Sequence, residues 1–417
     1  MTTRTAPSAD DFLADFRTMS GFGATANGGV DRQAASQADA AQRTWFRSIL
    51  EARGFTVRFD RIGNQWGLLE RVPGAPFVVV GSHMDSQPTA GRYDGAYGVL
   101  AAAHAAFRLA SAWDSNERTA PKYNVAVVNW FNEEGSRFKP SMMGSSVYTG
   151  KLALADALAV TDPQGVTVGE ALGAHGFLSD WEGPEAAFCA EIHIEQGRSM
   201  ERDGVTIGLV HSNWAANKYE FVVHGEQAHT GSTVIADRHD ALLGASLLVV
   251  AAREIADAFP GKVHTSVGQL DVHPNSPVVV PSRVQLLLDL RSADEDALAE
   301  ADAMLHRRVA EAEKAASVQV ERRTSHSWPV TPYQPEGVEL AAKAAADLGL
   351  PYKEVMTLAG HDSTNMKDLV PTVMLFVPSV DGISHNEHEY TTDEDIVAGL
   401  AMLTEVVGRL CDGALED

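Results

Sequence analysis

The stretch VVVGSHMDSQPTAGRYDGAYGVLAA, residues 78–102, connects an apolar run to a run of small residues through a polar loop. The apolar run that ends near Ser82 is typical of a buried strand, and residues 95–113 have the composition of a helix. The loop between them holds a histidine, two aspartates and several glycines. Because ligands of open α/β sheets bind just beyond the carboxyl ends of the strands, this loop is a candidate site.

The same alternation continues along the chain on both sides of this stretch. The further predicted elements are a helix at 36–54, a hairpin at 55–70, buried strands at 123–135 and 186–197, a helix at 335–349, a strand at 371–379 and a helix at 391–410. Buried strands that alternate with helices indicate an α/β fold with a mainly parallel sheet and helices on both faces.

The pattern changes between residues 212 and 327. Four strands are predicted here, at 217–225, 262–272, 282–292 and 318–327, and two helices, at 236–259 and 293–317. Their order is β-α-β-β-α-β, the ferredoxin-like arrangement. We therefore expect residues 212–327 to form an inserted second domain, and residues 1–211 and 328–417 to form the first.

Composition, net charge and cysteine content restrict the classes of partner and the cellular location that we expect. The 417 residues are 45% hydrophobic and 21% charged, which is globular composition. A net charge of −23 repels phosphate backbones, so we expect no nucleic-acid partner. No apolar run approaches the roughly 20 residues that cross a bilayer, and the N-terminus does not read as a secretory signal. Two cysteines without metal-type spacing favour reduced thiols and a cytoplasmic protein.

Polar residues cluster where the predicted strands end, in SHMDS (82–86), YDG (93–95), NEEGSRF (132–138), EIHIEQG (191–197) and GISHNEHEY (382–390). These segments supply His83, Asp85, Asp94, Glu133, Glu134, His193 and His385. Any one of them alone reads as a hydrogen-bonded loop residue or a solvated strand end. Imidazoles and carboxylates that recur at one edge of a sheet favour zinc or a similar divalent ion.

With these motifs the sequence resembles the amidohydrolases of the M20 metallopeptidase clan, in the hydantoinase/carbamoylase group. Three further motifs, GEQAHTGST (225–233), LDLR (288–291) and AGHDS (359–363), occur in the family's order, and the resemblance covers nearly the whole chain. NEEGSRF and HIEQG are more specific than the H-x-D element. The resemblance implies a catalytic α/β domain with an inserted lid through which two subunits form a homodimer.

The resemblance also implies a dinuclear metal site. It makes His83 and Glu134 ligands of separate ions, with Asp94 bridging the two. His193 joins the first ion and His385 the second. Two divalent ions per subunit are expected, zinc first, with manganese, cobalt or nickel left open. A cis peptide bond is expected between Asp94 and Gly95.

Catalytic roles follow from the same resemblance. Glu133 matches the general base, and Asp85 matches a group that fixes the tautomer of His83. His229 matches the oxyanion donor, which the partner subunit's lid contributes in that family. Each has a simpler interpretation as a solvated loop residue.

Substrate contacts are less regular. Arg291 matches the arginine that clamps a substrate carboxylate with two parallel hydrogen bonds. Gln196 matches another substrate-side position, and Asn217 could line the cleft. Val278 stands where the family usually has a substrate-binding asparagine. The metal site therefore looks intact while the substrate clamp is altered.

Three functions remain open at this stage. The leading one is hydrolysis of the C–N bond of an N-carbamoyl (ureido) amino acid or a related linear amide, by a metal-activated water with Glu133 as base. Val278 motivates the second, an amidase, aminoacylase or dipeptidase that acts on another amide. The third is a metal-binding scaffold without catalysis, which would require a missing ligand or base.

Overall fold

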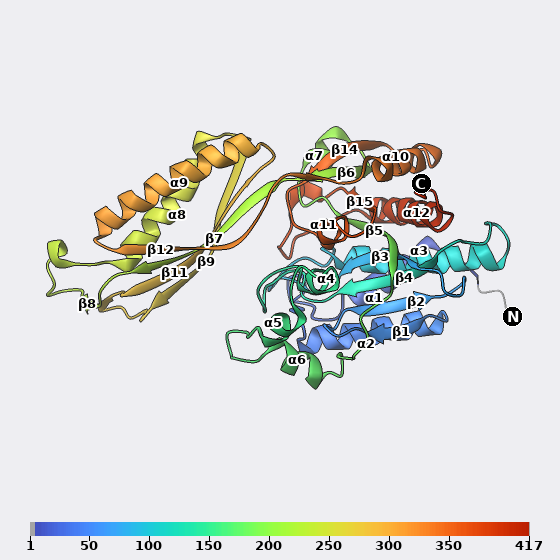
Figure 1. Cartoon of the computed structure of the whole chain (residues 1–417), viewed down its shortest axis with the longest axis horizontal. Helices are drawn as coiled ribbons and strands as arrows, with labels where there is room; N and C mark the ends of the chain where they lie inside the picture. The colour runs from blue at the N-terminus through green and yellow to red at the C-terminus, as the bar shows by residue number, and fades with distance from the viewer. Residues whose placement is uncertain (1–4, 417) are drawn as a thin grey trace. The chain divides into compact units, whose positions relative to one another are not determined.

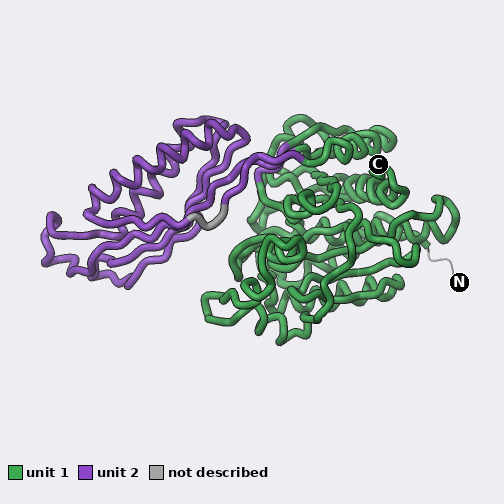
Figure 2. Tube along the Cα trace, viewed as in Figure 1, with its two compact units in different colours: residues 1–211, 333–355, 359–417 green, residues 212–332, 356–358 purple. Residues whose placement is uncertain are grey.

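The computed structural model describes residues 5–416, with the side chains of 324–326 excepted. The chain divides into two compact units (Figure 2). Unit 2 comprises Ser212–Pro332 and Met356–Leu358, and unit 1 comprises the rest. The C-terminal boundary of the inserted segment thus falls at residue 332 instead of 327, because the chain pairs Thr331 with Asn213 before it returns to unit 1.

Unit 1 holds most of a nine-stranded sheet in the order β1-β2-β4-β3-β5-β15-β6-β13, with β14 beside β6 (Figure 1). Strand β13 and the ends of β6 and β14 belong to unit 2. The strands are β1 (Thr56–Phe59), β2 (Gln65–Leu69), β3 (Phe77–His83), β4 (Asn124–Trp130), β5 (Ala186–Ile194), β6 (Ile207–Asn213), β13 (Thr331–Pro332), β14 (Tyr352–Thr357) and β15 (Thr372–Val377). The predicted parallel arrangement is correct only for the centre, β4-β3-β5-β15. The edges are antiparallel. A connection as short as the one between β1 and β2 cannot join parallel neighbours, which need a dozen or more residues.

Helices cover both faces of this sheet. One face carries α1 (Ala9–Met19), α2 (Gln37–Ala52), α3 (Ala96–Asp114), α10 (Pro335–Asp347) and α12 (Asp393–Cys411). The other carries α4 (Met143–Tyr148) and α11 (Asp362–Met366). Three further short helices are α5 (Leu154–Ala159), α6 (Val168–Ala174) and α7 (Ser199–Asp203). Burial on both sides explains the apolar run at residues 125–128 within β4, since all residues of the strand are buried.

Helix α3 sets the position of the loop that follows β3. It packs so closely across β5 that a Cβ atom at Gly98 would lie 2.2 Å from the Ile192 main-chain oxygen. The helix begins after Gly95, whose φ of 63° is in the left-handed region that glycine adopts freely. Residues 84–95 are thereby held between a buried strand and a buried helix.

Unit 2 contains a four-stranded antiparallel sheet in the order β12-β7-β11-β9. Its elements are β7 (Ala215–His224), α8 (Ala241–Ala258), β9 (Val263–His273), β11 (Arg283–Ser292), α9 (Glu295–Ala316) and β12 (Gln319–Trp328). A short pair, β8 (Ala228–His229) with β10 (Val279–Val280), stands apart. Along β11 the residues at even positions are buried in the core with α8 and α9, and those at odd positions are only partly buried or exposed.

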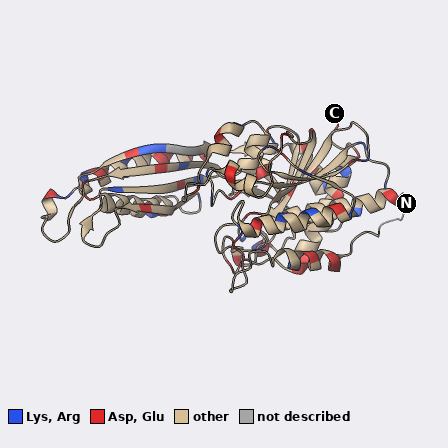
Figure 3. Cartoon of the chain, turned by 90° about the horizontal axis from the view of Figure 1, so that it is seen from below, with Lys and Arg blue, Asp and Glu red and all other residues tan. Residues whose placement is uncertain are grey.

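Charged residues of both signs are interspersed along the elements of both units (Figure 3). Acidic residues outnumber basic ones, 56 to 33. Across residues 5–416, none of the helices combines the length and apolar character that a membrane span needs.

Candidate metal centre

The carboxyl ends of β3 and β5 bring two histidines together. The parallel register pairs Val80 with Ala190. Three residues further on, each strand carries a histidine on the same face of the sheet. The ring centroids of His83 and His193 are 5.8 Å apart, and both side chains are buried.

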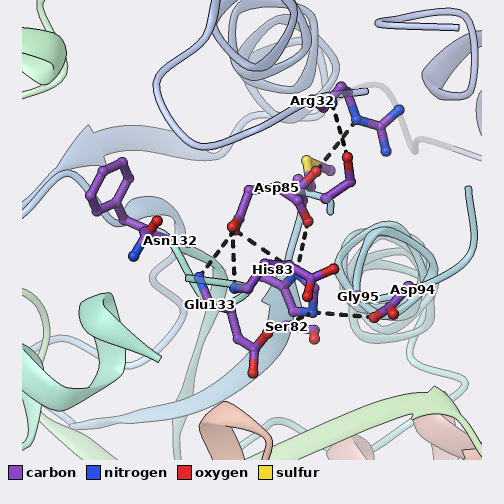
Figure 4. Close-up of polar contacts among 12 residues, drawn as sticks. Arg32, Ser82, His83, Asp85, Asp94, Gly95, Asn132 and Glu133 are labelled. Atoms are coloured by element: carbon purple, nitrogen blue, oxygen red, sulfur yellow. Dashed lines mark hydrogen bonds and ion pairs between the residues drawn. The ribbon is translucent and has the colours of Figure 1, made fainter. Parts of the chain in front are cut away.

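Asp94 lies between these two rings and a third one. Its Oδ1 is 3.5 Å from His83 Nε2 and 3.0 Å from His193 Nε2. Its Oδ2 is 3.1 Å from His385 Nε2, which is also 3.4 Å from Glu134 Oε2. Two groups of ligand atoms result, each within 4.8 Å, and Asp94 belongs to both. Figure 4 shows Asp94 beside the His83 ring.

Main-chain carbonyls orient the two buried rings. His83 Nδ1 donates to the Asp85 oxygen at 3.0 Å, and His193 Nδ1 donates to the Ile194 oxygen at 2.9 Å. A ring that donates from Nδ1 presents the lone pair of Nε2, which is the atom that faces Asp94 in both cases. This is how metal-binding histidines are usually held.

The spacing of the ligand atoms suits a divalent cation. Ligands at 2.0–2.1 Å in a tetrahedral zinc site lie about 3.3 Å from one another. The four histidine–carboxylate separations run from 3.0 to 3.5 Å, and all the ligand atoms of each group lie within 4.8 Å of one another. Imidazole nitrogen combined with carboxylate oxygen suits zinc and its neighbours among the divalent metals. The residues therefore fit divalent ions of the kind that the sequence favoured, and the two groups are compatible with the pair that the resemblance implied.

Without a cation, the cluster holds protons. Burial opposes the charged form of His385, yet hydrogen bonding to Asp94 raises the pKa of its imidazole to about 9. Burial and the neighbouring Asp94 carboxylate raise the pKa of Glu134 to about 7. For His83, burial is outweighed by Glu133 and Asp94, which raise its pKa well above the usual value. Divalent ions would displace these protons.

Glu133 is buried beside this cluster and belongs to neither ligand group. Its Oε2 is 3.4 Å from His83 Nε2 (Figure 4). Burial raises the pKa of Glu133 well above its usual value, and Asp362 and Glu134 add to this. A carboxyl group with raised proton affinity at the edge of a metal cluster can carry protons.

Contrary to what the resemblance implied, the Asp85 side chain does not orient the His83 ring. Its carboxylate is 3.9 Å from His83 Nδ1, so the main-chain carbonyl, and not the side chain, orients that ring. The carboxylate instead accepts from the main-chain N–H groups of Glu133 at 3.2 Å and Glu134 at 3.3 Å. Asp85 thereby ties the loop after β3 to the loop after β4.

In unit 2, His229 is exposed at the end of β8. Its Nδ1 lies 3.0 Å from the Gly231 N–H and 3.1 Å from the Ser232 N–H. Because these main-chain groups donate, Nδ1 accepts, and the ring proton is on Nε2. The side chain is thus prepared as a neutral hydrogen-bond donor.

Arg291 lies on β11 with its guanidinium partly engaged. It donates from Nε to Asp289 Oδ2 at 2.8 Å and from Nη1 to the Leu358 oxygen at 2.7 Å. Nη2 is 2.6 Å from the same Asp289 oxygen. One N–H on each Nη atom remains, which is the number that a bidentate carboxylate requires. Asn217 is not brought together with Arg291, since it pairs with Leu290 on the opposite face of the sheet.

The comparisons with known proteins agree with this geometry. A family model described as peptidase family M20/M25/M40 matches residues 79–409. The chain belongs to this family. A protein of Mycolicibacterium smegmatis is 58% identical over 97% of this chain and 94% of its own length. An N-carbamoyl-L-amino-acid amidohydrolase of Rhizobium meliloti is 35% identical over 96% of this chain and 95% of its own.

A crystal structure of an amidase of the hydantoinase/carbamoylase family from Burkholderia vietnamiensis superposes with a TM-score of 0.92, at 35% identity, and covers 99% of each chain. The predicted membership of the hydantoinase/carbamoylase group is confirmed. This M20 protein is therefore a hydrolase for carbon–nitrogen bonds other than peptide bonds, as the motifs indicated.

One backbone expectation drawn from the family is wrong. The cis peptide bonds in the described part of the chain are Lys139–Pro140 and His273–Pro274, and Asp94–Gly95 is not among them. Gly95 makes the turn with its positive φ instead. Its N–H donates to His193 Nε2 at 3.0 Å.

Several contacts around the M20 site were not predicted. Gln87 donates to Glu134 Oε2 at 2.9 Å. Gln196, expected on the substrate side, donates to Asp94 Oδ2 at 2.8 Å and to Ser384 at 3.1 Å. Glu389 is buried beneath the Asp94 loop. Ser384 and Glu389 stand in the GISHNEHEY motif, where attention to the histidine alone passed over them.

Proposed function

We propose that this protein is a dinuclear metal hydrolase that cleaves an N-carbamoyl amino acid or a related ureido acid. The observation that carries the proposal is that Asp94 belongs to two ligand groups while Glu133 lies beside them and in neither. In the proposed assignment, His83 and His193 hold one ion, and Glu134 and His385 hold the other. Zinc is the first choice, with manganese, cobalt or nickel as alternatives.

Bound divalent ions would supply Lewis acidity and a water that ionises near neutral pH. Glu133 would accept a proton from the attacking water and later deliver it to the leaving nitrogen. Asp85 holds the main chain of Glu133, so the carboxylate keeps its place while its charge changes. The products would be the amino acid, ammonia and carbon dioxide.

His229 is proposed to donate from Nε2 to the oxygen of the attacked carbonyl. Two main-chain amides at Nδ1 support this role, because they keep the ring in the tautomer that donates without carrying charge. Arg291 is proposed to bind the substrate carboxylate through its two remaining N–H groups. Asn217 has less support as a substrate contact, since it shares its face with the buried Leu290.

A homodimer formed through unit 2 is part of the proposal. Strand β9 ends its sheet, so one edge of an 11-residue strand has no partner strand within the described chain. Beside it in the fold, α8 exposes Leu243 by 45% and Val250 by 54%. Edge strands with nearby exposed apolar side chains favour association, and a second copy can pair with itself about a twofold axis.

We also place the protein in the cytoplasm. The support is that Cys189 and Cys411 are free thiols, both buried. Reducing compartments maintain that state.

A second candidate is cleavage of another amide, as in an amidase, aminoacylase or dipeptidase. It is favoured by Val278, which is 59% exposed and cannot offer the polar contact of the asparagine that the family resemblance led us to expect at this position. The leaving group separates the two candidates. Ureido hydrolysis releases ammonia and amino acid in equal amounts, with carbon dioxide, whereas deacylation of an N-acyl amino acid releases the amino acid and a carboxylic acid without ammonia.

The test uses purified protein loaded with zinc or manganese and a panel of N-carbamoyl and N-acetyl amino acids. We expect equal release of ammonia and amino acid from a carbamoyl substrate. Glu133→Gln, which keeps the shape but cannot accept the proton, should lower the rate by about 10²–10⁴-fold. Full activity of Glu133→Gln, or release of amine without ammonia, would contradict the proposed reaction.

A further inference from the structure

Glu389 is a buried carboxylate that the proposed reaction does not use. It lies four residues beyond His385 in the loop between β15 and α12, and it is 4% exposed. Its Oε1 accepts from two consecutive main-chain N–H groups, Tyr93 at 2.9 Å and Asp94 at 3.0 Å. Glu389 therefore holds the main chain at Tyr93 and at Asp94, the aspartate that both ligand groups share.

The second oxygen of Glu389 reaches the same aspartate by another path. Glu389 Oε2 lies 2.9 Å from the Ser384 hydroxyl, and that hydroxyl lies 3.2 Å from Asp94 Oδ2. Gln196 donates to Asp94 Oδ2 as well, at 2.8 Å. Because the Ser384 hydroxyl has one proton, it donates to only one of these two carboxylates at a time. The direct hold of Glu389 on the loop is through the main-chain N–H groups of Tyr93 and Asp94, and Asp94 Oδ1 is left to face His83 and His193.

The loop is shaped around this carboxylate. A Cβ atom at Gly91 would lie 2.1 Å from Glu389 Oε1 and 2.4 Å from Glu389 Cβ. Only a residue without a side chain lets the backbone pass so close. A buried carboxylate next to another carboxylate is electrostatically unfavourable, so its presence points to a geometric role that outweighs the repulsion.

We infer that Glu389 is a positioning residue for the metal centre: it fixes the Asp94 loop so that one carboxylate serves both ligand groups. The inference rests on the proposed function, because it presupposes that these groups bind ions. Glu389 also connects the loop that carries His385 to the loop that carries Asp94. Ligands of both groups are then held by one side chain.

The test compares Glu389→Gln with Glu389→Asp. Glutamine keeps an oxygen for the two main-chain N–H groups and can donate to Ser384, but it has no charge. Aspartate keeps the charge but is one methylene shorter and cannot reach both partners. If Glu389 positions the loop, the zinc affinity of Glu389→Gln should be within a few-fold of wild type. That of Glu389→Asp should fall by roughly 10–100-fold.

Zinc affinity is measured by equilibrium dialysis against chelator-buffered zinc, with circular dichroism to verify folding. Glu387→Ala is the matched control, because it removes a glutamate of the same loop that contacts Thr25 and Asn27 instead of Asp94. It should bind zinc as the wild type does.

Two results would overturn the inference: a Glu389→Asp variant with wild-type zinc affinity, or a Glu389→Gln variant as impaired as Glu389→Asp. Neither of these two results would contradict the proposed function. A wild-type protein that binds no zinc would instead contradict the proposed metal centre itself.

Discussion

Glu133 and Glu134 are neighbours in the chain, yet their surroundings differ. Glu134 receives hydrogen bonds from Gln87 and faces His385. Glu133 faces His83 and lies outside both ligand groups. The turn after β4 therefore separates the proposed ligand Glu134 from the proposed proton carrier Glu133, and Asp85 accepts from the main-chain N–H of each.

Arg291 offers a test of substrate recognition at the level of one side chain. Arg291→Lys keeps the charge but loses the planar pair of N–H donors. We expect kcat/KM for an N-carbamoyl amino acid to fall by roughly 10–100-fold, because hydrogen bonds to a charged group are lost. The corresponding carboxamide, which has no carboxylate, should be hydrolysed equally by both proteins. An equal loss for both substrates would exclude the clamp.

Asp60 provides a test of pH dependence away from the metal centre. Its carboxylate accepts from Trp66 Nε1 at 2.9 Å and from Asn64 Nδ2 at 2.8 Å. Burial raises its pKa to about 6 from the ordinary 3.8. The folded chain thus binds more protons than the unfolded chain in this window. The contribution of Asp60 is fully present below pH 3.8 and is lost as the pH rises through about 6.

The contribution of Asp60 to the free energy of unfolding falls by about 3 kcal/mol as the pH rises from 3.8 through about 6. Asp60→Asn cannot ionise, so its free energy of unfolding relative to wild type should improve by about that amount between pH 4 and pH 7. Urea titrations across that range measure the difference. A difference that stays constant with pH would show that the pKa of Asp60 is not raised.

At the level of elements, the contact between α3 and β5 determines where the site loop lies. Gly98→Ala would bring a Cβ atom to 2.2 Å from the Ile192 oxygen, which is main chain and cannot move independently. We expect a loss of about 1–3 kcal/mol in the free energy of unfolding, as overpacked cores show. Urea denaturation provides the measurement.

The chain contains a matched control for this substitution. Gly173 lies in α6, and a Cβ atom there would meet nothing within 4 Å. Gly173→Ala should therefore be neutral or stabilise by up to about 1 kcal/mol, since alanine favours the helix. If both substitutions had the same effect, the close packing of α3 on β5 would not be the cause.

At the level of the whole molecule, the proposed dimer makes a prediction about mixed subunits. Glu133→Ala and His229→Ala should each be inactive alone. If His229 serves the partner's site, a mixed dimer contains one complete site. Unfolding and refolding the two variants together should then restore about a quarter of the wild-type activity, because half of the dimers are mixed and each has one working site.

The readout is ammonia release from a carbamoyl substrate, with each variant refolded alone as the control. Absence of recovery from a mixture that contains mixed dimers would mean that His229 acts in its own subunit. A wild-type protein that sediments as a monomer at assay concentration would contradict the dimer.

The sequence by itself predicted most of the long helices and strands, but not α1 (Ala9–Met19), β6 (Ile207–Asn213) or β14 (Tyr352–Thr357). The predicted helix at 36–54 is Gln37–Ala52 in the structure, and the predicted strand at 318–327 is Gln319–Trp328. The sequence was also sufficient for the family. The reason is that burial periodicity, helix caps and motifs each depend on residues that are close together in the chain. They can therefore be recognised without knowing the fold.

Only the tertiary structure decided how the loops meet. Glu389 and Asp94 are 295 residues apart in the chain, and their contact depends on strand order, register and two loop conformations together. The strand pairing beyond the predicted hairpin at 55–70, the carbonyl that orients His83 and the bond at Asp94–Gly95 were decided in the same way. Each arises from segments packed side by side, and no local pattern of residues contains that information.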